Sequence, residues 1–244
     1  MSRILIADDD PIVRLRMRKL AKSRQDIAAI ADAEDGVSAL IGIQTFNPDV
    51  IFLSVDLPRM SGFDVLYNTQ TINCSVVLQS ERQHLALKVF KNKQCNYLLK
   101  PFSDEHWHAS LDSATLLKST RETQLKTLRE HLRLDGLFLN QILVQSKAKN
   151  HLLRSEIISH FSSREHITFI HTNERSFLYD SSLTSLEQRL DPQQFLRVHR
   201  NTIVNLEHIV GFESEKNRTI VLRNGTILQV SRAKWRILRK PYFE

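Results

Sequence analysis

The stretch Asp49-Val-Ile-Phe-Leu-Ser54-Val-Asp-Leu-Pro58-Arg-Met-Ser-Gly62 decides how the first half of this chain is expected to fold. It joins an apolar run, 50–53, to a polar turn. Similar short apolar runs occupy 4–7, 27–30, 76–78 and 97–99, and segments of helix length lie between them. Runs that are apolar on both faces suit the buried strands of a parallel sheet. The repeated alternation predicts a doubly wound α/β domain over residues 1–120.

Polar residues follow the ends of these predicted strands. In a doubly wound sheet, the functional site lies at the carboxyl ends of the strands. We therefore expect one site that contains Asp8, Asp9, Ser54, Ser80 and Lys100. The adjacent carboxylates of the first two residues offer the hard oxygen ligands that Mg²⁺ prefers.

These motifs resemble the receiver domain of two-component response regulators, and the resemblance covers residues 1–119. It implies a flavodoxin-like fold in which Lys100 pairs with the phosphoacceptor or with the phosphate. It also implies that the Ser80 hydroxyl senses the phosphate and that Tyr97 rotates with that hydroxyl. The family's phosphoacceptor is an aspartate, and the residue aligned with it here is Ser54.

Two positions depart from the receiver pattern. A Ser54 hydroxyl cannot form an acyl phosphate, and Glu81 stands where the family usually has a small residue. Asp56 is not expected to take over as acceptor, because two residues of extended strand would place it about 6–7 Å too far along. We predict a degenerate receiver that acts independently of phosphorylation. Its Asp8 and Asp9 would bind Mg²⁺ weakly at best, and no other cofactor is expected.

The second half differs from the first in its predicted secondary structure and in its charge. Residues 121–140 are predicted to form a helical linker, and residues 141–244 a mostly antiparallel β domain with a hairpin at Arg223-Asn224-Gly225. Residues 1–120 carry 14 basic and 14 acidic side chains, whereas residues 121–244 carry 20 and 13, so 20 − 13 = +7 accounts for the whole net charge. This asymmetry favours a polyanionic partner for the second half.

The run Phe195-Leu-Arg197-Val-His199-Arg200-Asn201-Thr-Ile-Val204-Asn205-Leu-Glu-His208-Ile209 resembles the LytTR DNA-binding domain, as does Val230-Ser231-Arg232. The resemblance spans roughly 140–240 and implies a β domain that inserts loops into successive grooves of double-stranded DNA. It points to His166, Arg200 and Arg232 as base-contacting residues in three polar clusters that are expected to lie between β segments. Arg164 and Lys234 are predicted to contact phosphates.

Two further residues belong to the predicted DNA-binding set. His199 is either a packed histidine or a DNA contact, and the sequence leaves both interpretations open. Asn201 lies in the same turn, which it is expected to stabilise, and Asn205 is assigned a structural role. We also predict a homodimer through the receiver surface at about 82–119, so that two DNA-binding domains meet two repeated half-sites. A protein regulator is a further possible partner.

Other classes of function are disfavoured. No apolar run approaches the roughly 20 residues of a membrane span, and the first residues lack a signal-peptide pattern, so we expect a cytoplasmic protein. The two cysteines provide no disulfide framework. The ten histidines lack the spacing of a zinc site. We expect no enzyme, because neither a nucleophile–base arrangement nor a phosphate-binding glycine loop is present.

Two alternatives to the phosphorylation-independent regulator remain open. In the first, the chain is an ordinary phosphorylation-dependent LytTR regulator that a natural or engineered Ser54 has inactivated. In the second, it is an interaction module that sequesters another regulator and binds little DNA itself.

Overall fold

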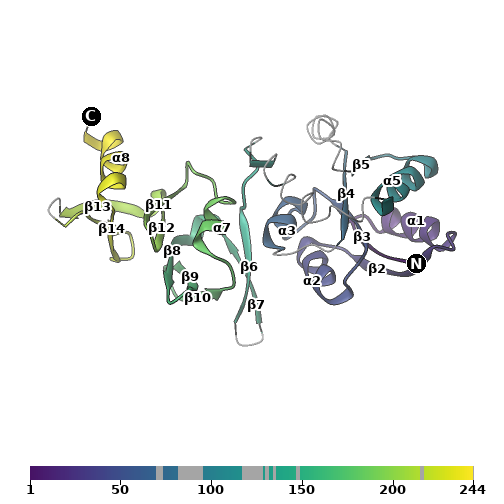
Figure 1. Ribbon diagram of the computed structural model, residues 1–244, viewed down its shortest axis with the longest axis horizontal. Coiled ribbons are helices and arrows are strands. Elements are labelled where there is room, and N and C mark those ends of the chain that lie inside the picture. The colour runs from purple at the N-terminus through teal and green to yellow at the C-terminus, as the bar shows by residue number, and fades with distance from the viewer. Residues whose placement is uncertain are drawn as a thin grey trace. The chain divides into compact units, whose positions relative to one another are not determined.

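The computed structural model describes residues 1–69, 74–81, 96–116, 129, 132–133, 136–146, 149–214 and 217–243. They form two compact units, Met1–Leu137 and Phe138–Glu244 (Figure 1). Most of the predicted linker at 121–140, and residues 82–95 and 117–119 of the predicted dimer surface, lie outside the described residues, and both the linker and the dimer stay predictions. None of the described helices is long and apolar enough to cross a membrane.

The first unit is built on a parallel sheet of five strands in the order β2-β1-β3-β4-β5 (Figure 1). The strands are β1 (Ser2–Ala7), β2 (Ile27–Ala33), β3 (Val50–Ser54), β4 (Ser75–Ser80) and β5 (Asn96–Leu99). The described helices are α1 (Pro11–Lys22), α2 (Gly36–Phe46), α3 (Gly62–Asn68) and α5 (Asp104–Leu116). Helices α1 and α5 lie on one face of the sheet, and α2 and α3 on the other. The predicted flavodoxin-like α/β fold is confirmed.

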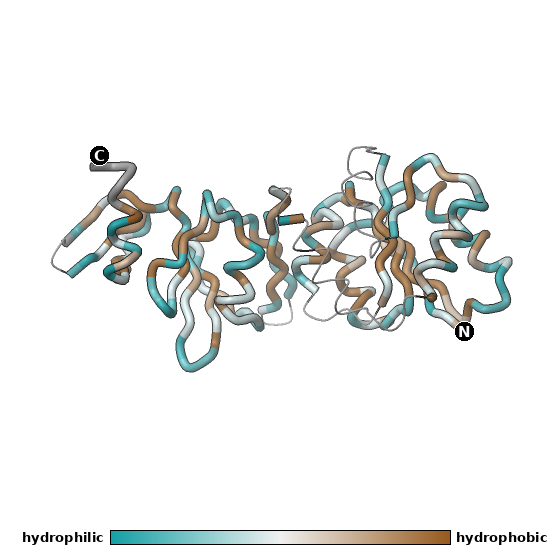
Figure 2. Tube along the Cα trace, turned by 45° about the horizontal axis from the view of Figure 1, so that its top comes forward, coloured by the Kyte–Doolittle hydropathy of each residue, from teal (hydrophilic) through white to brown (hydrophobic). Residues whose placement is uncertain are grey.

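Apolar side chains on both faces of the central strands hold this unit together. Figure 2 shows these strands as hydrophobic along most of their length. On the α1–α5 face, Phe52 of β3 stacks on Trp107 of α5 with 5.3 Å between ring centroids, and both side chains are fully buried. Such burial makes the strand ends a rigid support for the polar residues that follow them.

The start of α1 fixes the first of these polar residues. The side chain of Asp10 accepts a hydrogen bond from the backbone N–H of Ile12, and Pro11 occupies the first turn of the helix. Both features favour a helix start at this point. Only residues 8–10 therefore separate β1 from α1, which leaves Asp8 and Asp9 in the short connection at the carboxyl end of the sheet.

The second unit is mostly antiparallel, as predicted. Its main sheet has the order β10-β9-β8-β12-β11, and smaller sheets are formed by β6-β7 and by β13-β14-β15. The strands are β6 (Gln141–Ser146), β7 (Lys149–Arg154), β8 (Ile158–Arg164), β9 (Ile167–Thr172), β10 (Ser176–Tyr179), β11 (Phe195–His199), β12 (Thr202–Asn205), β13 (Ile209–Ser214), β14 (Thr219–Leu222) and β15 (Ile227–Gln229). The helices are α7 (Leu183–Glu187) and α8 (Arg232–Phe243), with 3₁₀ turns η2 (Ser155–Ile157) and η3 (Leu206–His208).

Two local predictions in this unit are confirmed. The β14–β15 hairpin turns at Asn224-Gly225, where Gly225 has a φ of 79° that suits glycine. Asn205 is fully buried, and its side-chain amide donates to the carbonyl oxygen of Ile158 at 3.0 Å. Its Oδ1 accepts from the N–H of Glu207 at 3.1 Å, so this residue joins η3 to the start of β8.

Gly62 generates a prediction about stability. A Cβ added at this position would lie closer to the carbonyl oxygen of Ser54 than van der Waals contact permits. We expect Gly62→Ala to lower the free energy of unfolding of the first unit by about 1–3 kcal/mol, because the backbone must shift. Urea denaturation followed by circular dichroism measures this change. Gly211→Ala is the control, since an added Cβ there meets nothing within 4 Å; equal stability of the two variants would contradict the prediction.

Candidate functional site

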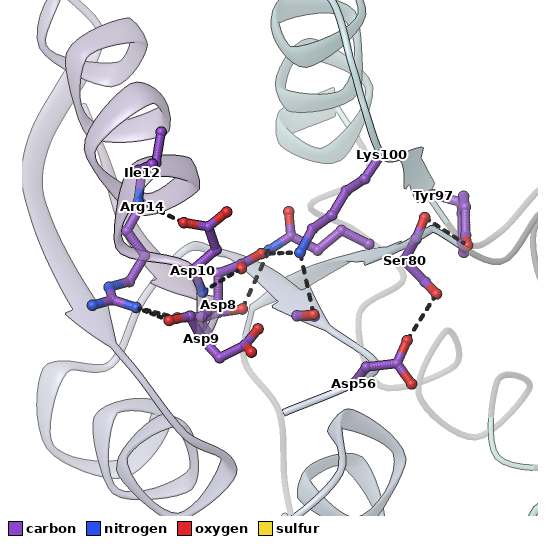
Figure 3. A network of polar contacts seen from close by, with 12 residues as sticks. Asp8, Asp9, Asp10, Ile12, Arg14, Asp56, Ser80, Tyr97 and Lys100 are labelled. Atoms are coloured by element: carbon purple, nitrogen blue, oxygen red, sulfur yellow. Dashed lines mark hydrogen bonds and ion pairs between the residues drawn. The ribbon is translucent and has the colours of Figure 1, made fainter. Parts of the chain in front are cut away.

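A buried ion pair lies at the carboxyl end of the parallel sheet. Asp8 is fully buried, and its Oδ2 lies 2.5 Å from Nζ of Lys100 (Figure 3). The side-chain amide of Gln79 donates to the same oxygen at 2.8 Å, and the backbone N–H of Asp10 donates to Oδ1 at 3.1 Å. Burial raises the pKa of the Asp8 carboxyl, while the hydrogen bond and the charge of Lys100 act in the opposite direction.

Ser54 lies beside this ion pair, at the end of β3. Its side chain is buried, and its Oγ accepts a hydrogen bond from Nζ of Lys100 at 3.5 Å. The lysine thus joins the predicted acceptor position to Asp8. Because the Ser54 hydroxyl carries no charge, the charge of Lys100 is balanced here by Asp8.

The donor set of this pocket does not fit an Mg²⁺ ion. Both carboxylate oxygens of Asp8 accept hydrogen bonds from protein donors, and one of them also contacts an ammonium group. Ser54 supplies no carboxylate, and Asp9 is exposed. In the part of the chain that the structure describes, no group of three or more His, Cys, Asp or Glu side chains is placed to hold a metal ion. The expectation of a weak site at Asp8 and Asp9 therefore gains no support.

A second polar contact lies next to Ser54 and was not foreseen. The hydroxyl of Ser80 donates to Oδ2 of Asp56 at 3.1 Å (Figure 3). The hydroxyl of Tyr97 donates to the carbonyl oxygen of Ser80 at 3.4 Å, and the tyrosine is buried. Glu81, which follows Ser80, is exposed. Asp56 thus contacts the residue that was predicted to sense the phosphate.

The candidate nucleic-acid interface consists of three segments of the second unit. The first is the β8–β9 turn, where Arg164, Glu165 and His166 are exposed. Glu165 and His166 have φ values of 51° and 68°. Two positive φ angles in a two-residue loop match the tight hairpin turn that follows the twist of its strands. The turn projects Arg164 and His166 from the end of the hairpin.

The second segment is the β11–β12 turn, with Arg200 and Asn201 both exposed. Nδ1 of His199 lies 2.6 Å from Oδ1 of Asn201, which also accepts from the Thr202 hydroxyl at 3.1 Å. His199 is therefore hydrogen-bonded within the turn, and Asn201 makes the stabilising contacts expected of it.

The third segment differs from its prediction. The cluster Ser231–Lys234 was expected between β segments, but Arg232 and Lys234 lie in the first turn of helix α8. The helix packs on the sheet through Trp235 and Leu238, which belong to a core cluster with Val198. These apolar contacts bury one face of α8. Arg232 and Arg236, four residues apart, lie together on its exposed face.

Backbone hydrogen bonds connect the three segments. The N–H of Ser163, just before the first turn, donates to the carbonyl oxygen of Asn201 at 2.9 Å. The N–H of Ser231, just before α8, donates to the carbonyl oxygen of Val198 at 2.8 Å. The segments are distant in sequence, but β11 and its turn join them into one connected surface.

Sequence reasoning missed two residues of the first pocket. Gln79 breaks an otherwise apolar run that continues from Val76, and a polar residue inside a buried strand was a usable signal. Asp56 was considered only as a phosphoacceptor, and its contact with Ser80 depends on how the chain turns after β3, which periodicity does not predict.

Comparison with protein-family models finds one match in each half of the chain. Residues 4–112 match the response regulator receiver domain, and residues 148–242 match the LytTr DNA-binding domain. The chain is a response regulator of the LytTR type. These matched ranges contain all the residues of the two sites described above.

Curated relatives of this LytTR-type response regulator align with it over nearly their whole length. The chain is 27% identical to the transcriptional regulatory protein BtsR of Salmonella typhi over 98% of each chain. It is 25% identical to the transcriptional regulatory protein LytR of Staphylococcus aureus over 95% of each chain. Among solved structures, a LytTr DNA-binding domain from Bacillus cereus is 21% identical, with a TM-score of 0.39, and the match covers 41% of this chain and 94% of that one.

A pair of stacked histidines supports the sheet that carries these turns. His160 of β8 lies across from His171 of β9, with 4.0 Å between ring centroids and 5° between ring planes. Burial lowers the pKa of His160 to about 3, and the charges of His171 and His208 act in the same direction. Burial also lowers the pKa of His171. Both rings are therefore neutral in the folded protein at neutral pH.

This pair makes the stability of the second unit depend on pH. Between about pH 6.5 and pH 3 the unfolded chain protonates His160 while the folded unit does not, so the unfolded state binds more protons. We expect the free energy of unfolding to fall by about 1 kcal/mol per pH unit as the pH drops through this range. Denaturant titrations from pH 7 to pH 4 should show a shallower dependence for His160→Phe. His166→Gln, at an exposed turn, should leave the dependence unchanged, and identical slopes in all three proteins would refute this origin.

Proposed function

We propose that this LytTR-type regulator binds specific DNA sequences without needing phosphorylation of its receiver. The observation that carries the proposal is the Lys100–Asp8 ion pair beside Ser54. The cation that would meet a phosphoacceptor carboxylate or a phosphate is already balanced by a buried carboxylate, and the acceptor position holds a hydroxyl.

The Ser80–Asp56 hydrogen bond supports the same proposal. In receivers, the resemblance implies that the hydroxyl at this position senses a phosphate. Here the hydroxyl donates to a carboxylate of the same chain. A charged acceptor strengthens such a hydrogen bond. Ser80 therefore has an anionic acceptor in the unmodified protein, and Tyr97 is already buried behind it.

The chemistry of the second unit supports sequence-specific binding. Arg200 and Arg232 are exposed on connected segments, and arginine can hold the O6 and N7 atoms of guanine through two hydrogen bonds. His166 extends the same surface. Arg164 and Lys234 are suited to phosphate contacts that position the protein without selecting sequence. His199 and Asn201 support the turn between them.

Homodimerisation completes the proposal. A receiver dimer formed through the surface at about 82–119 would bring two LytTR domains to two repeated half-sites. A protein regulator could control this assembly in place of a kinase.

Phosphodonors should leave the protein unchanged. We expect acetyl phosphate or beryllofluoride, each with Mg²⁺, to alter neither the oligomeric state nor the affinity for a DNA duplex selected by this chain from a random library. Analytical ultracentrifugation and fluorescence anisotropy measure the two quantities. Appearance of an acid-labile, hydroxylamine-sensitive phosphoprotein would overturn the proposal.

Ser54→Asp tests the rival in which Ser54 has inactivated an ordinary regulator, because that rival requires restored phosphorylation together with phosphate-enhanced binding.

Arg232 and Lys234 should behave differently towards DNA. Arg232→Ala should weaken binding of the selected duplex by about 1–3 kcal/mol and relax its sequence preference, because a base contact is lost. Lys234→Ala should weaken selected and scrambled duplexes alike and lower the salt slope by about 1. Anisotropy titrations at several salt concentrations separate the two patterns. If the unmodified chain selects no duplex from the library at any salt concentration, the sequestering alternative is favoured.

A further inference from the structure

Arg197 connects the second DNA-binding segment to helix α7. Its NH2 group donates to the carbonyl oxygen of Arg200 at 2.6 Å. Its NH1 group donates to the hydroxyl of Thr184 and to Oε2 of Glu187, each at 3.1 Å. One guanidinium thus joins the exposed β11–β12 turn to two side chains of α7.

These contacts indicate that the guanidinium has a structural role. Its two terminal nitrogens face the turn and α7, and only 24% of the side chain is exposed. The carboxylate of Glu187 balances its charge. A guanidinium has five N–H donors. Three contacts of Arg197 are made to acceptors within the protein, two from Nη1 and one from Nη2.

The contact from Arg197 to the carbonyl oxygen of Arg200 restrains the conformation of the β11–β12 turn. Arg200 and Asn201 are the two central residues of the turn, and both of their carbonyl oxygens are held from within the protein. Arg197 holds the first, and the backbone N–H of Ser163 holds the second. With both carbonyl groups fixed, the turn has little freedom to rotate. The Cα–Cβ bond of Arg200 then leaves the turn in one direction.

Helix α7 gives Arg197 a fixed support. The hydroxyl of Ser182 caps the start of the helix by accepting from the N–H of Ser185 at 3.1 Å. Leu183 and Leu186 are buried, and the helix contacts β8, β11 and β12. The planar fork of arginine loses little freedom when it bonds to such a support.

We propose that Arg197 is a positioning residue for DNA recognition, which orients Arg200 through the turn without contacting DNA itself. The inference rests on the proposed function, because it requires Arg200 to read a base. Arg197 then affects sequence preference from behind the DNA-binding surface, where it connects α7 to the β11–β12 turn.

The test compares Arg197→Gln with the unmodified full-length chain. The probes are the duplex selected from a random library and a scrambled duplex of the same composition. We expect affinity for the selected duplex to fall on the order of tenfold, since a misplaced bidentate contact loses most of its discrimination. Affinity for the scrambled duplex and the salt slope should not change. Equal losses on both duplexes with a lower salt slope would show a direct phosphate contact and overturn the inference.

A double-mutant cycle separates positioning from an independent role. In an Arg200→Ala background, Arg197→Gln should have no further effect on the selected duplex, because the side chain that it orients is absent. Additive losses would overturn the inference. Arg197→Lys keeps the charge but lacks the planar fork, so it should resemble Arg197→Gln. Full recovery with lysine would also overturn it.

Glu187→Gln is the second variant, used if Arg197→Gln fails to fold. Removal of a negative charge near DNA should by itself raise affinity. Loss of the support for Arg197 should instead lower affinity for the selected duplex alone, and a general increase would contradict the inference. If the unmodified chain prefers neither duplex, the proposed function fails. If it prefers the selected duplex and all Arg197 variants keep that preference, only the inference on Arg197 fails.

Discussion

The contact between Lys100 and Asp8 is the constraint on which the receiver pocket depends. A fully buried carboxylate is tolerated only when opposite charge and hydrogen bonds compensate for its lost hydration. Lys100, Gln79 and the N–H of Asp10 provide that compensation. The same contacts occupy the atoms that a metal ion or a phosphoacceptor would otherwise use. A hydroxyl at Ser54 is compatible with the surrounding fold because the ion pair beside it balances its own charge.

In the LytTR domain, order comes from backbone contacts between distant segments. The N–H groups of Ser163 and Ser231 both donate to the β11 region, and the side chain of Arg197 adds a contact from α7. Exposed arginines on separate loops would lose conformational freedom on binding DNA. Here the loops are already fixed to one another, so less ordering remains to oppose association. The rigid sheet and the packed face of α8 supply the support.

The sequence predicted the architecture well because both folds have strong periodic signals. Buried parallel strands read as apolar runs, and the Asn224-Gly225 hairpin has its own turn chemistry. What the sequence missed depended on spatial neighbours. The helical start at Arg232 was hidden because an adjacent polar cluster reads equally well as a loop. The roles of Gln79 and Asp56 depend on partners 71 and 24 residues away, and the two partners of Arg197 in α7 lie 13 and 10 residues away, which no local pattern contains.

The hydrogen bond from Ser80 to Asp56 differs from a phosphate contact in its permanence. An acyl phosphate is made, hydrolyses and has to be made again, so any contact that depends on it has a finite lifetime and carries timing information. A carboxylate encoded in the chain has no such lifetime. Under the proposed function, which needs no phosphate, the output of the regulator would have no such built-in timing, and the cell would adjust it by changing the amount of the protein or its binding partners.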